Sequence, residues 1–289
     1  FEIPQSGIME VSVLQFANYE DMPEVISIWQ ECFGDTAEEI KEFFSVFGDS
    51  ARVCLWKAES RIMGQLLLLP VCLHFSYVGE RKSSPAEYLY AVATKREFQN
   101  KGVCSSLLRD VSQLLQEEGK AAVLVPADAA LAAFYESRGF KNCFTEESVW
   151  VEAAGRNGGG ASEGKLIKTA VSEYEILRKD AFMDSAYVDI SRTMLSYAIS
   201  LCKKEGGICA RLLCPEGEYG VLYRPLCGGQ ELYIQEITAK SCAEAVTAAK
   251  RLLAVTGAKR AMLRRSYAGK GMCLPEGMPE NGYFNLVLE

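Results

Sequence analysis

An apolar strand pattern followed by a short polar loop and a helical pattern is the feature of this chain that most constrains its fold. The apolar run at residues 88–93 is typical of a buried strand. A polar loop then leads to a helix that we expect to begin at about Gly102. The first N–H groups of a helix have no partner inside the helix, and the helix dipole gives them partial positive charge. The sequence therefore predicts a phosphate site at this loop.

A glycine-rich segment divides the chain into two halves. The chain has 289 residues, 49% hydrophobic and 24% charged, which is typical of globular proteins and long enough for two domains. Residues 152–165 contain no apolar side chain larger than alanine, so they are interpreted as a linker or long surface loop. We expect an N-terminal domain at 9–151, the linker at 152–165 and a C-terminal domain at 166–289.

Both halves show the same order of helix and strand patterns. In the first half we expect strands at 11–16, 52–58, 62–75, 87–94, 121–125 and near 149, a hairpin around 78–85, and helices from Asp21 (as cap), at 36–47, 102–118 and 128–138. In the second half we expect helices at 172–182, 187–204 and 243–255, and strands at 208–213, 219–223, 231–238 and 260–263. The predicted fold class is α/β, with a mixed sheet in each of two tandem domains. The second copy lacks the polar glycine loop.

Charge and hydropathy exclude several classes of function. The net charge is −7 without a Lys/Arg-rich run, so no nucleic-acid partner is expected. The longest apolar run, 65–73, is too short to span a bilayer, and no secretory signal pattern is present, so we expect no membrane partner and a cytoplasmic location. The chain has one histidine, His74, which excludes a multi-histidine site, and no metal is expected. His74 lies on the less apolar face of its strand, which favours a solvated side chain.

The cysteines favour free thiols over a disulfide framework. Their number, eleven, is odd, and no pair has C-x-x-C spacing. Most stand in apolar surroundings, as Cys54 and Cys209 do. We therefore expect buried free thiols in a reducing compartment.

Three motifs carry a resemblance to a known family. They are Val92-Ala93-Thr94, then Gln99-x-x-Gly102-x-Cys104, then Asp128-x-x-Leu131-x-x-Phe134-Tyr135-x-x-x-Gly139-Phe140. In this order and spacing, residues 10–151 resemble the GCN5-related N-acetyltransferase (GNAT) superfamily. The second half is similar to it only in the order of its elements, as in tandem GNAT proteins with a degenerate C-terminal copy. The resemblance implies two tandem GNAT-like acyl-CoA N-acyltransferase domains.

The resemblance also implies acetyl-CoA as the co-substrate. Main-chain groups of the loop would bind its pyrophosphate; the matching positions are Gln99, Asn100, Lys101, Gly102, Val103, Cys104 and Ser105. The main chain of Val92, Ala93 and Thr94 would pair with pantetheine as an added strand. Cys104 stands where the family has glycine or alanine, and we interpret it as a small residue at a helix start. The loop does not match a Rossmann dinucleotide-binding motif, because it has one glycine instead of three. It does not match a P-loop, because Gly102 is followed by Val-Cys and not by Lys-Ser/Thr.

The resemblance singles out Tyr135 as the acid that protonates the departing CoA thiolate. The base is less clear, since the family's strand-four glutamate aligns with Tyr88 and Glu87 is one residue off. One residue of shift turns a side chain to the other face of a strand. Glu87 is therefore a base only if a bulge corrects the register, and otherwise a surface carboxylate. Glu146, Glu147 or a chain of waters remain alternatives.

The sequence thus predicts an acetyl-CoA-dependent N-acetyltransferase. The acetyl group would move to a primary amine of a small molecule or peptide by direct attack in a ternary complex. A non-catalytic acyl-CoA-binding or protein-interaction module is the alternative, because the glutamate is displaced and the second half is degenerate.

Overall fold

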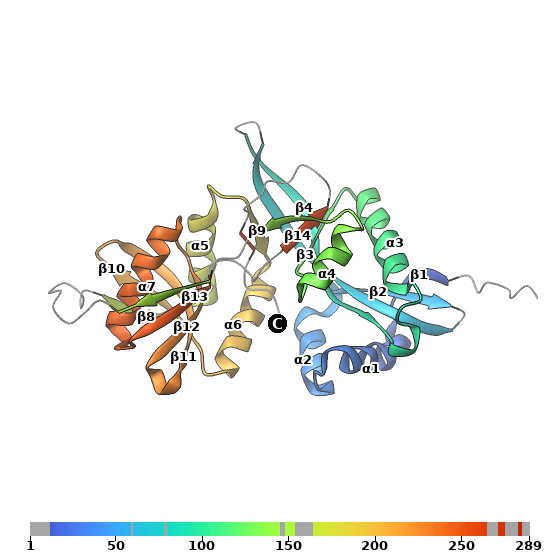
Figure 1. Cartoon of the computed structure of the whole chain (residues 1–289), viewed down its shortest axis with the longest axis horizontal. Helices are drawn as coiled ribbons and strands as arrows, with labels where there is room; N and C mark the ends of the chain where they lie inside the picture. The colour runs from blue at the N-terminus through green and yellow to red at the C-terminus, as the bar shows by residue number, and fades with distance from the viewer. Residues whose placement is uncertain are drawn as a thin grey trace, which may run out of the picture. The chain divides into compact units, whose positions relative to one another are not determined.

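The chain folds into helices and two mixed β-sheets (Figure 1). The computed structural model describes residues 12–58, 60–77, 80–144, 148–153, 164–264, 271–274 and 283–284. Its α-helices are α1 (Met22–Phe33), α2 (Ala37–Phe47), α3 (Val103–Glu117), α4 (Ala129–Glu136), α5 (Val171–Phe182), α6 (Arg192–Lys204) and α7 (Cys242–Thr256). Its strands are β1 (Ser12–Phe16), β2 (Arg52–Ala58), β3 (Arg61–Tyr77), β4 (Glu80–Thr94), β5 (Ala121–Leu124), β6 (Lys141–Phe144), β7 (Ser148–Glu152), β8 (Lys165–Lys168), β9 (Tyr187–Ile190), β10 (Ile208–Cys214), β11 (Gly217–Leu226), β12 (Glu231–Ile237), β13 (Arg260–Arg264) and β14 (Gly271–Leu274).

The strands of the two sheets are not divided cleanly at the glycine-rich segment. Over the described residues, the first sheet runs β1-β2-β3-β4-β5-β14-β6, with β9 paired to β3. The second runs β7-β13-β12-β11-β10-β8. Strand β7 therefore joins the second sheet although it precedes that segment, and β14 joins the first sheet from the far end of the chain. The predicted mixed α/β class with two sheets is confirmed, while this exchange of strands was not predicted.

Several local predictions are corrected by the structure. Residues 187–190 form β9 rather than the start of a helix, because they pair antiparallel with Val71–His74 of β3. Of the hairpin expected around 78–85, residues 80–85 belong to the long strand β4, and residues 78 and 79 lie outside the described residues. Asp21 stands at the start of α1 but makes no side-chain cap. Its carboxylate instead accepts hydrogen bonds from the Asn18 main-chain N–H, at 3.0 Å, and from Lys57 Nζ, at 2.6 Å.

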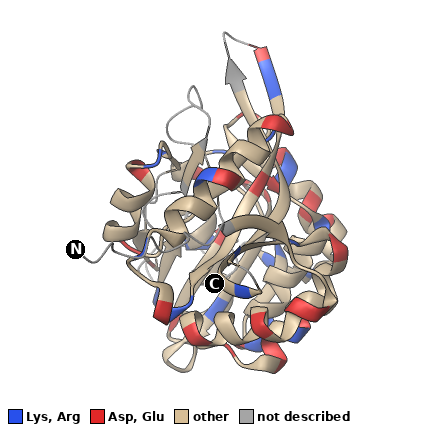
Figure 2. Cartoon of the chain, turned by 90° about the vertical axis from the view of Figure 1, so that its right-hand side faces the viewer, with Lys and Arg blue, Asp and Glu red and all other residues tan. Residues whose placement is uncertain are grey.

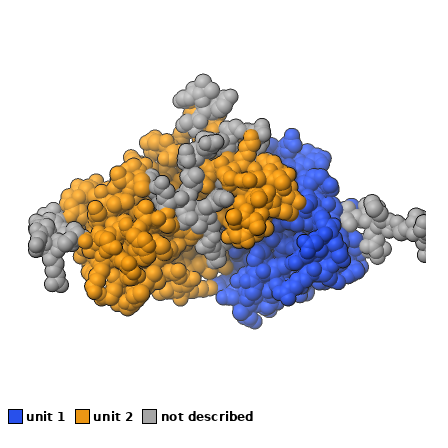
Figure 3. All heavy atoms as spheres, in the orientation of Figure 1, with its two compact units in different colours: residues 1–70, 87–122 blue, residues 71–86, 123–289 orange. Residues whose placement is uncertain are grey.

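The chain divides into two compact units (Figure 3). The first comprises residues 1–70 and 87–122, and the second comprises residues 71–86 and 123–289. In the first unit, Trp29 of α1 packs edge-on against Phe43 of α2 at 5.2 Å between ring centroids, and Phe43 stacks on Tyr90 of β4 at 5.6 Å. These aromatic contacts fix α1 and α2 against β4. In the second unit, the apolar face of α7 packs on the second sheet through Ala248, Leu252 and their neighbours.

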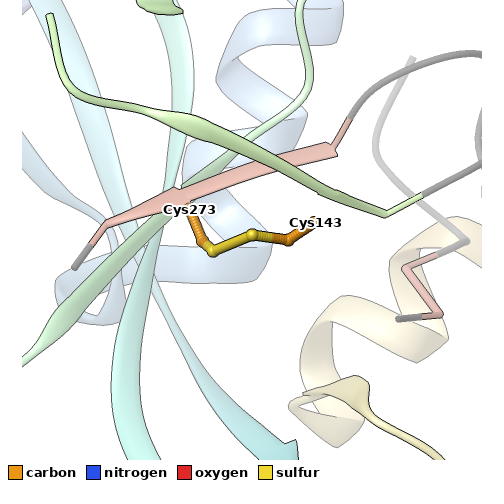
Figure 4. Close-up of a disulfide and its surroundings, with 2 residues drawn as sticks. All are labelled: Cys143 and Cys273. Atoms are coloured by element: carbon orange, nitrogen blue, oxygen red, sulfur yellow. A yellow bond between two sulfur atoms is a disulfide. The ribbon is translucent and has the colours of Figure 1, made fainter. Parts of the chain in front are cut away.

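A disulfide joins two strands of the first sheet (Figure 4). Cys143 lies in β6 and Cys273 in β14, and the two strands pair antiparallel. The prediction that all cysteines are free thiols is wrong for this pair. The partners are 130 residues apart in sequence, and β14 carries no pattern that places it beside β6. The other nine cysteines are free.

Candidate active site: the turn from β4 to α3

The turn between β4 and α3 contains two residues with left-handed backbone. Asn100 has φ 60° and Gly102 has φ 82°. Gly102 is the N-cap of α3, and its carbonyl accepts the first helical hydrogen bond from the Ser106 N–H at 3.0 Å. A Cβ built on Gly102 meets no atom of the protein within 4 Å. The turn therefore places the start of α3 beside open space, and its backbone conformation is one that glycine adopts at little cost.

The N-terminus of α3 is left without a side-chain cap, in contrast to that of α7. No side chain of the turn caps α3, because Gly102 has none to offer. In α7, the equivalent helix of the second sheet, the Ser241 hydroxyl accepts from the Glu244 N–H at 3.2 Å, and the Glu244 carboxylate accepts from the Lys240 N–H at 2.9 Å. An N-terminus already satisfied by its own side chains offers fewer donors to an external anion. Of these two helices, α3 has the start suited to a phosphate.

Helix α1 holds the turn in place. The Glu31 carboxylate accepts a hydrogen bond from the Arg96 main-chain N–H at 2.7 Å, and Lys95 Nζ lies 3.2 Å from Glu24. Residues of α1 lie more than 60 positions away in sequence, so no local pattern identifies them as supports of the turn. They are the part of the site that sequence reasoning missed.

The Thr94 carbonyl at the end of β4 is engaged by two side chains. Gln99 Nε2 donates to it at 3.1 Å, and Cys32 Sγ of α1 lies at 3.5 Å. Gln99 thus fastens the turn back onto β4. Lys101 Nζ lies 5.5 Å from the Phe98 ring centroid, a cation–π distance that keeps the ammonium beside the turn. Gln99, Asn100, Lys101 and Gly102 are all exposed, whereas Val103 is buried and Cys104 and Ser105 are half-buried.

Glu87 is buried at the start of the apolar part of β4, with 2% of its surface exposed. Its Oε1 accepts from Arg52 Nη2 at 3.0 Å and from Lys120 Nζ at 2.9 Å. Both cations also pair with Glu118, at 2.6 and 2.8 Å. The expectation of a surface carboxylate is wrong, because these two cations compensate the buried charge. Figure 2 marks the acidic and basic residues on the ribbon, and both kinds occur along its helices and strands.

The electrostatics of this cluster are dominated by its hydrogen bonds. Those from Arg52 and Lys120 lower the pKa of Glu118 to about 2. Hydrogen bonding to Glu118 raises the pKa of both Arg52 and Lys120. Between Glu87 and the turn, Ala91 has φ 49°, an unusual value for a non-glycine residue inside a strand. This is a local irregularity of the kind that a register correction in β4 requires.

Tyr135 lies in α4, which begins where the sequence predicts. Asp128 caps the helix by accepting from the Leu131 N–H at 2.7 Å. The Tyr135 side chain is 7% exposed and packs edge-on against Phe134 and Phe140, at 5.5 and 5.8 Å between centroids. The turn belongs to the first compact unit and Tyr135 to the second. Glu146 and Glu147 lie outside the described residues.

His74 is less solvated than expected. Its ring stacks on Tyr187 of β9 at 4.8 Å, and its Nε2 lies 3.7 Å from Asp189. Burial lowers the pKa of His74 despite the neighbouring carboxylate.

Over the described residues, no cluster of His, Cys, Asp and Glu side chains is arranged to hold a metal ion. Among the described helices, none has the length and apolar character needed to cross a membrane.

Comparison with known proteins places this turn inside a recognised domain. Residues 14–143 match the family model of the acetyltransferase (GNAT) domain. A comparison with curated proteins found no significant match.

Solved structures share the fold over most of the chain. A protein from Enterococcus faecalis V583, described as a probable N-acyltransferase, is 15% identical, with a TM-score of 0.68 over 91% of this chain and 72% of that one. A GCN5-related N-acetyltransferase from Anabaena variabilis is 14% identical, with a TM-score of 0.68 over the same shares. Eis1 from Mycobacterium abscessus is 11% identical, with a TM-score of 0.63 over 88% of this chain and 65% of that one. At sequence identities of 11–15%, these similarities show a shared fold, and they do not show a shared activity.

Proposed function

We propose that this chain, whose residues 14–143 match the acetyltransferase (GNAT) domain family, transfers the acetyl group of acetyl-CoA to a primary amine. The observation that carries the proposal is the turn at Asn100 and Gly102, which opens α3 without a side-chain cap and next to open space. A diphosphate at this turn would accept hydrogen bonds from the first N–H groups of α3 and lie at the positive end of its dipole. The acceptor is the amine of a small molecule or a peptide.

We propose that the cofactor lies along the end of β4 with its diphosphate on the turn. The main chain of Val92, Ala93 and Thr94 would pair with the pantetheine amides. The Thr94 carbonyl already accepts from Gln99 and approaches Cys32, so the pairing would rest on the remaining main-chain groups of this segment. The residues of the turn, from Gln99 to Ser105, would supply N–H donors, and Lys101 would add positive charge.

The reaction proposed is direct attack of a neutral amine on the thioester carbonyl in a ternary complex. The nitrogen–carbon bond forms, the carbon–sulfur bond breaks, the nitrogen releases one proton to water, and the thiolate takes one proton as it leaves. Holding both reactants together supplies much of the rate enhancement. Tyr135 is the proposed donor of that proton, which a phenol supplies when it is held beside the sulfur.

Glu87 remains the candidate carboxylate on β4, but its environment favours a supporting role. Its Oε1 is occupied by Arg52 and Lys120, which hold the carboxylate in place, and its Oε2 is buried without a hydrogen-bond partner among the described residues. We propose that Glu87 primarily orders the start of β4 and that the amine loses its proton to water. A Glu87→Gln variant tests this, because a base role requires its turnover to fall with acetyl-CoA affinity unchanged.

We also propose a tandem arrangement, with domains at 9–151 and 166–289 and a linker at 152–165, of which 154–163 lie outside the described residues. Support comes from β12, α7 and β13, which repeat the order of β4, α3 and β5. The side-chain cap on α7 supports a second copy that no longer binds a diphosphate.

The experiment is a CoA-release assay with the full chain and a panel of polyamines, aminoglycosides, amino acids and peptides. Release of CoA that depends on one class of amine, together with the mass of the acetylated amine, supports the transferase. Tight acetyl-CoA binding without turnover on any amine favours the alternative, a non-catalytic acyl-CoA-binding or interaction module; the occupied Glu87 is the observation that keeps this alternative open. Failure to bind acetyl-CoA refutes both.

A further inference from the structure

A small pocket lies in the second compact unit, and none of its lining residues belongs to the turn that opens α3. Its volume is about 100 Å³, which suits a molecule of a few heavy atoms rather than a nucleotide. Helix α6 forms one wall through Ala198, Leu201 and Cys202, and strands β11, β12 and β13 contribute Arg224, Tyr233 and Arg264. The wall on α6 is largely apolar, and the wall on the sheet carries two guanidinium groups.

The two arginines of this pocket both contact Tyr233. Arg264 is 6% exposed, and its Nη1 donates to the Tyr233 hydroxyl at 2.9 Å. The Arg224 guanidinium lies over the Tyr233 ring, 5.0 Å from its centroid. Tyr233 therefore holds two cationic side chains at one wall of a small cavity.

One carboxylate faces these cations from the lining of the pocket. Glu205, at the end of α6, pairs with Arg224 Nη1. Arg224 Nε, in contrast, is buried and finds no hydrogen-bond acceptor among the described residues. The lining thus carries two arginines and one glutamate, so its side chains have a net positive charge. A buried N–H donor without an acceptor is costly, and because Nε has no exposed surface, an anion in the pocket would meet the outer N–H groups of Arg224 rather than Nε.

Cys202 does not oppose an anion here. Burial raises the pKa of its thiol to about 11, so the thiol is neutral at physiological pH. It adds weakly polar surface to the α6 wall and no negative charge.

We infer that this pocket binds a small organic carboxylate. Guanidinium groups bind carboxylates through planar, paired hydrogen bonds, and the apolar side chains of α6 suit the hydrocarbon part of such a ligand. A bare inorganic anion would leave that wall unused. The site lies on β11, β12 and β13 of the second sheet, of which β12 and β13 pair in parallel. The inference is independent of acetyl transfer.

The experiment measures propionate binding to the full chain by calorimetry, with sodium chloride at matched ionic strength as the blank. Arg224→Gln is the test variant, since Arg224 is half-buried and its replacement leaves the buried Arg264 in place. Arg251→Gln is the matched control, because Arg251 lies on α7 and pairs with Glu216, outside the pocket lining. Thermal unfolding verifies that both variants are folded.

The wild type and Arg251→Gln should bind propionate saturably, and Arg224→Gln should bind it at least about tenfold more weakly. Three outcomes overturn the inference. They are non-saturable binding to the wild type, equal affinity in Arg224→Gln, and binding of inorganic phosphate that propionate does not displace. Should Arg224→Gln fail to fold, Arg224→Lys replaces it, because a lysine keeps the charge and loses the paired donors.

Discussion

Replacing Gly102 by alanine separates the backbone cost of the turn from its contact with a ligand. With φ at 82°, an alanine here adopts a left-handed conformation that costs about 1–2 kcal/mol, and nothing within 4 Å adds a steric clash inside the protein. Gly119, at the other end of α3, has φ 67° and equally open surroundings. Gly102→Ala and Gly119→Ala should therefore lose similar stability, on the order of 1 kcal/mol or a few degrees in Tm.

Acetyl-CoA affinity should distinguish these two variants. A Cβ at position 102 would enter the space assigned to the diphosphate and weaken charge-assisted hydrogen bonds to α3, so Gly102→Ala should bind acetyl-CoA about tenfold to a hundredfold more weakly. Gly119→Ala should bind it as the wild type does. Thermal unfolding and calorimetric titration measure the two effects separately. Equal acetyl-CoA affinity in both variants would refute the assignment of the diphosphate to this turn.

Three further predictions concern Tyr135 as the proposed acid, the charge cluster and the cysteines. Tyr135→Phe should lower kcat about a hundredfold and leave acetyl-CoA affinity unchanged. The control Tyr223→Phe, at another buried tyrosine, should keep the kcat of the wild type. An unaltered kcat in Tyr135→Phe would show that Tyr135 is not the acid. Because the pKa of Glu118 is lowered from 4.5 to about 2 in the folded state, its contribution to stability is complete above pH 4.5 and is lost as the pH falls toward 2. Urea unfolding should therefore show a smaller loss of stability between pH 7 and pH 3 in Glu118→Gln than in the wild type, and equal losses would contradict this. Thiol titration of the denatured chain should count nine thiols without reductant and eleven after reduction, whereas eleven in both cases would exclude the disulfide between Cys143 and Cys273.

The parts of the fold that depend on local pattern could be predicted from the sequence. The strand, the loop and the start of α3 near Gly102 are encoded within about twenty residues by apolar spacing and a glycine that accepts positive φ. The Asp128 cap of α4 is local in the same sense, because donor and acceptor are three residues apart. Periodicity also predicts most of the other helices and strands, although it misses strands such as β8, β9 and β14.

The parts that depend on long-range pairing could not be predicted. Residues 187–190 form β9 because they pair with β3, which is far away in sequence. The local sequence pattern, which predicts a helix, does not reveal that partner. The disulfide and β14 need a partner from the other half of the chain. The burial of Glu87 depends on Arg52 and Lys120, which come from β2 and from the residue before β5, so its surroundings are set by the sheet and not by its neighbours in sequence.

The most direct measurement of the central claim is a crystal structure of the full chain with bound CoA. The diphosphate should lie against the main-chain N–H groups at the start of α3, with its oxygens within hydrogen-bond distance of residues 100–104. The thiol end should run along the end of β4. A CoA molecule bound elsewhere on the chain, or a diphosphate that avoids this turn, would contradict the proposed acetyltransferase site.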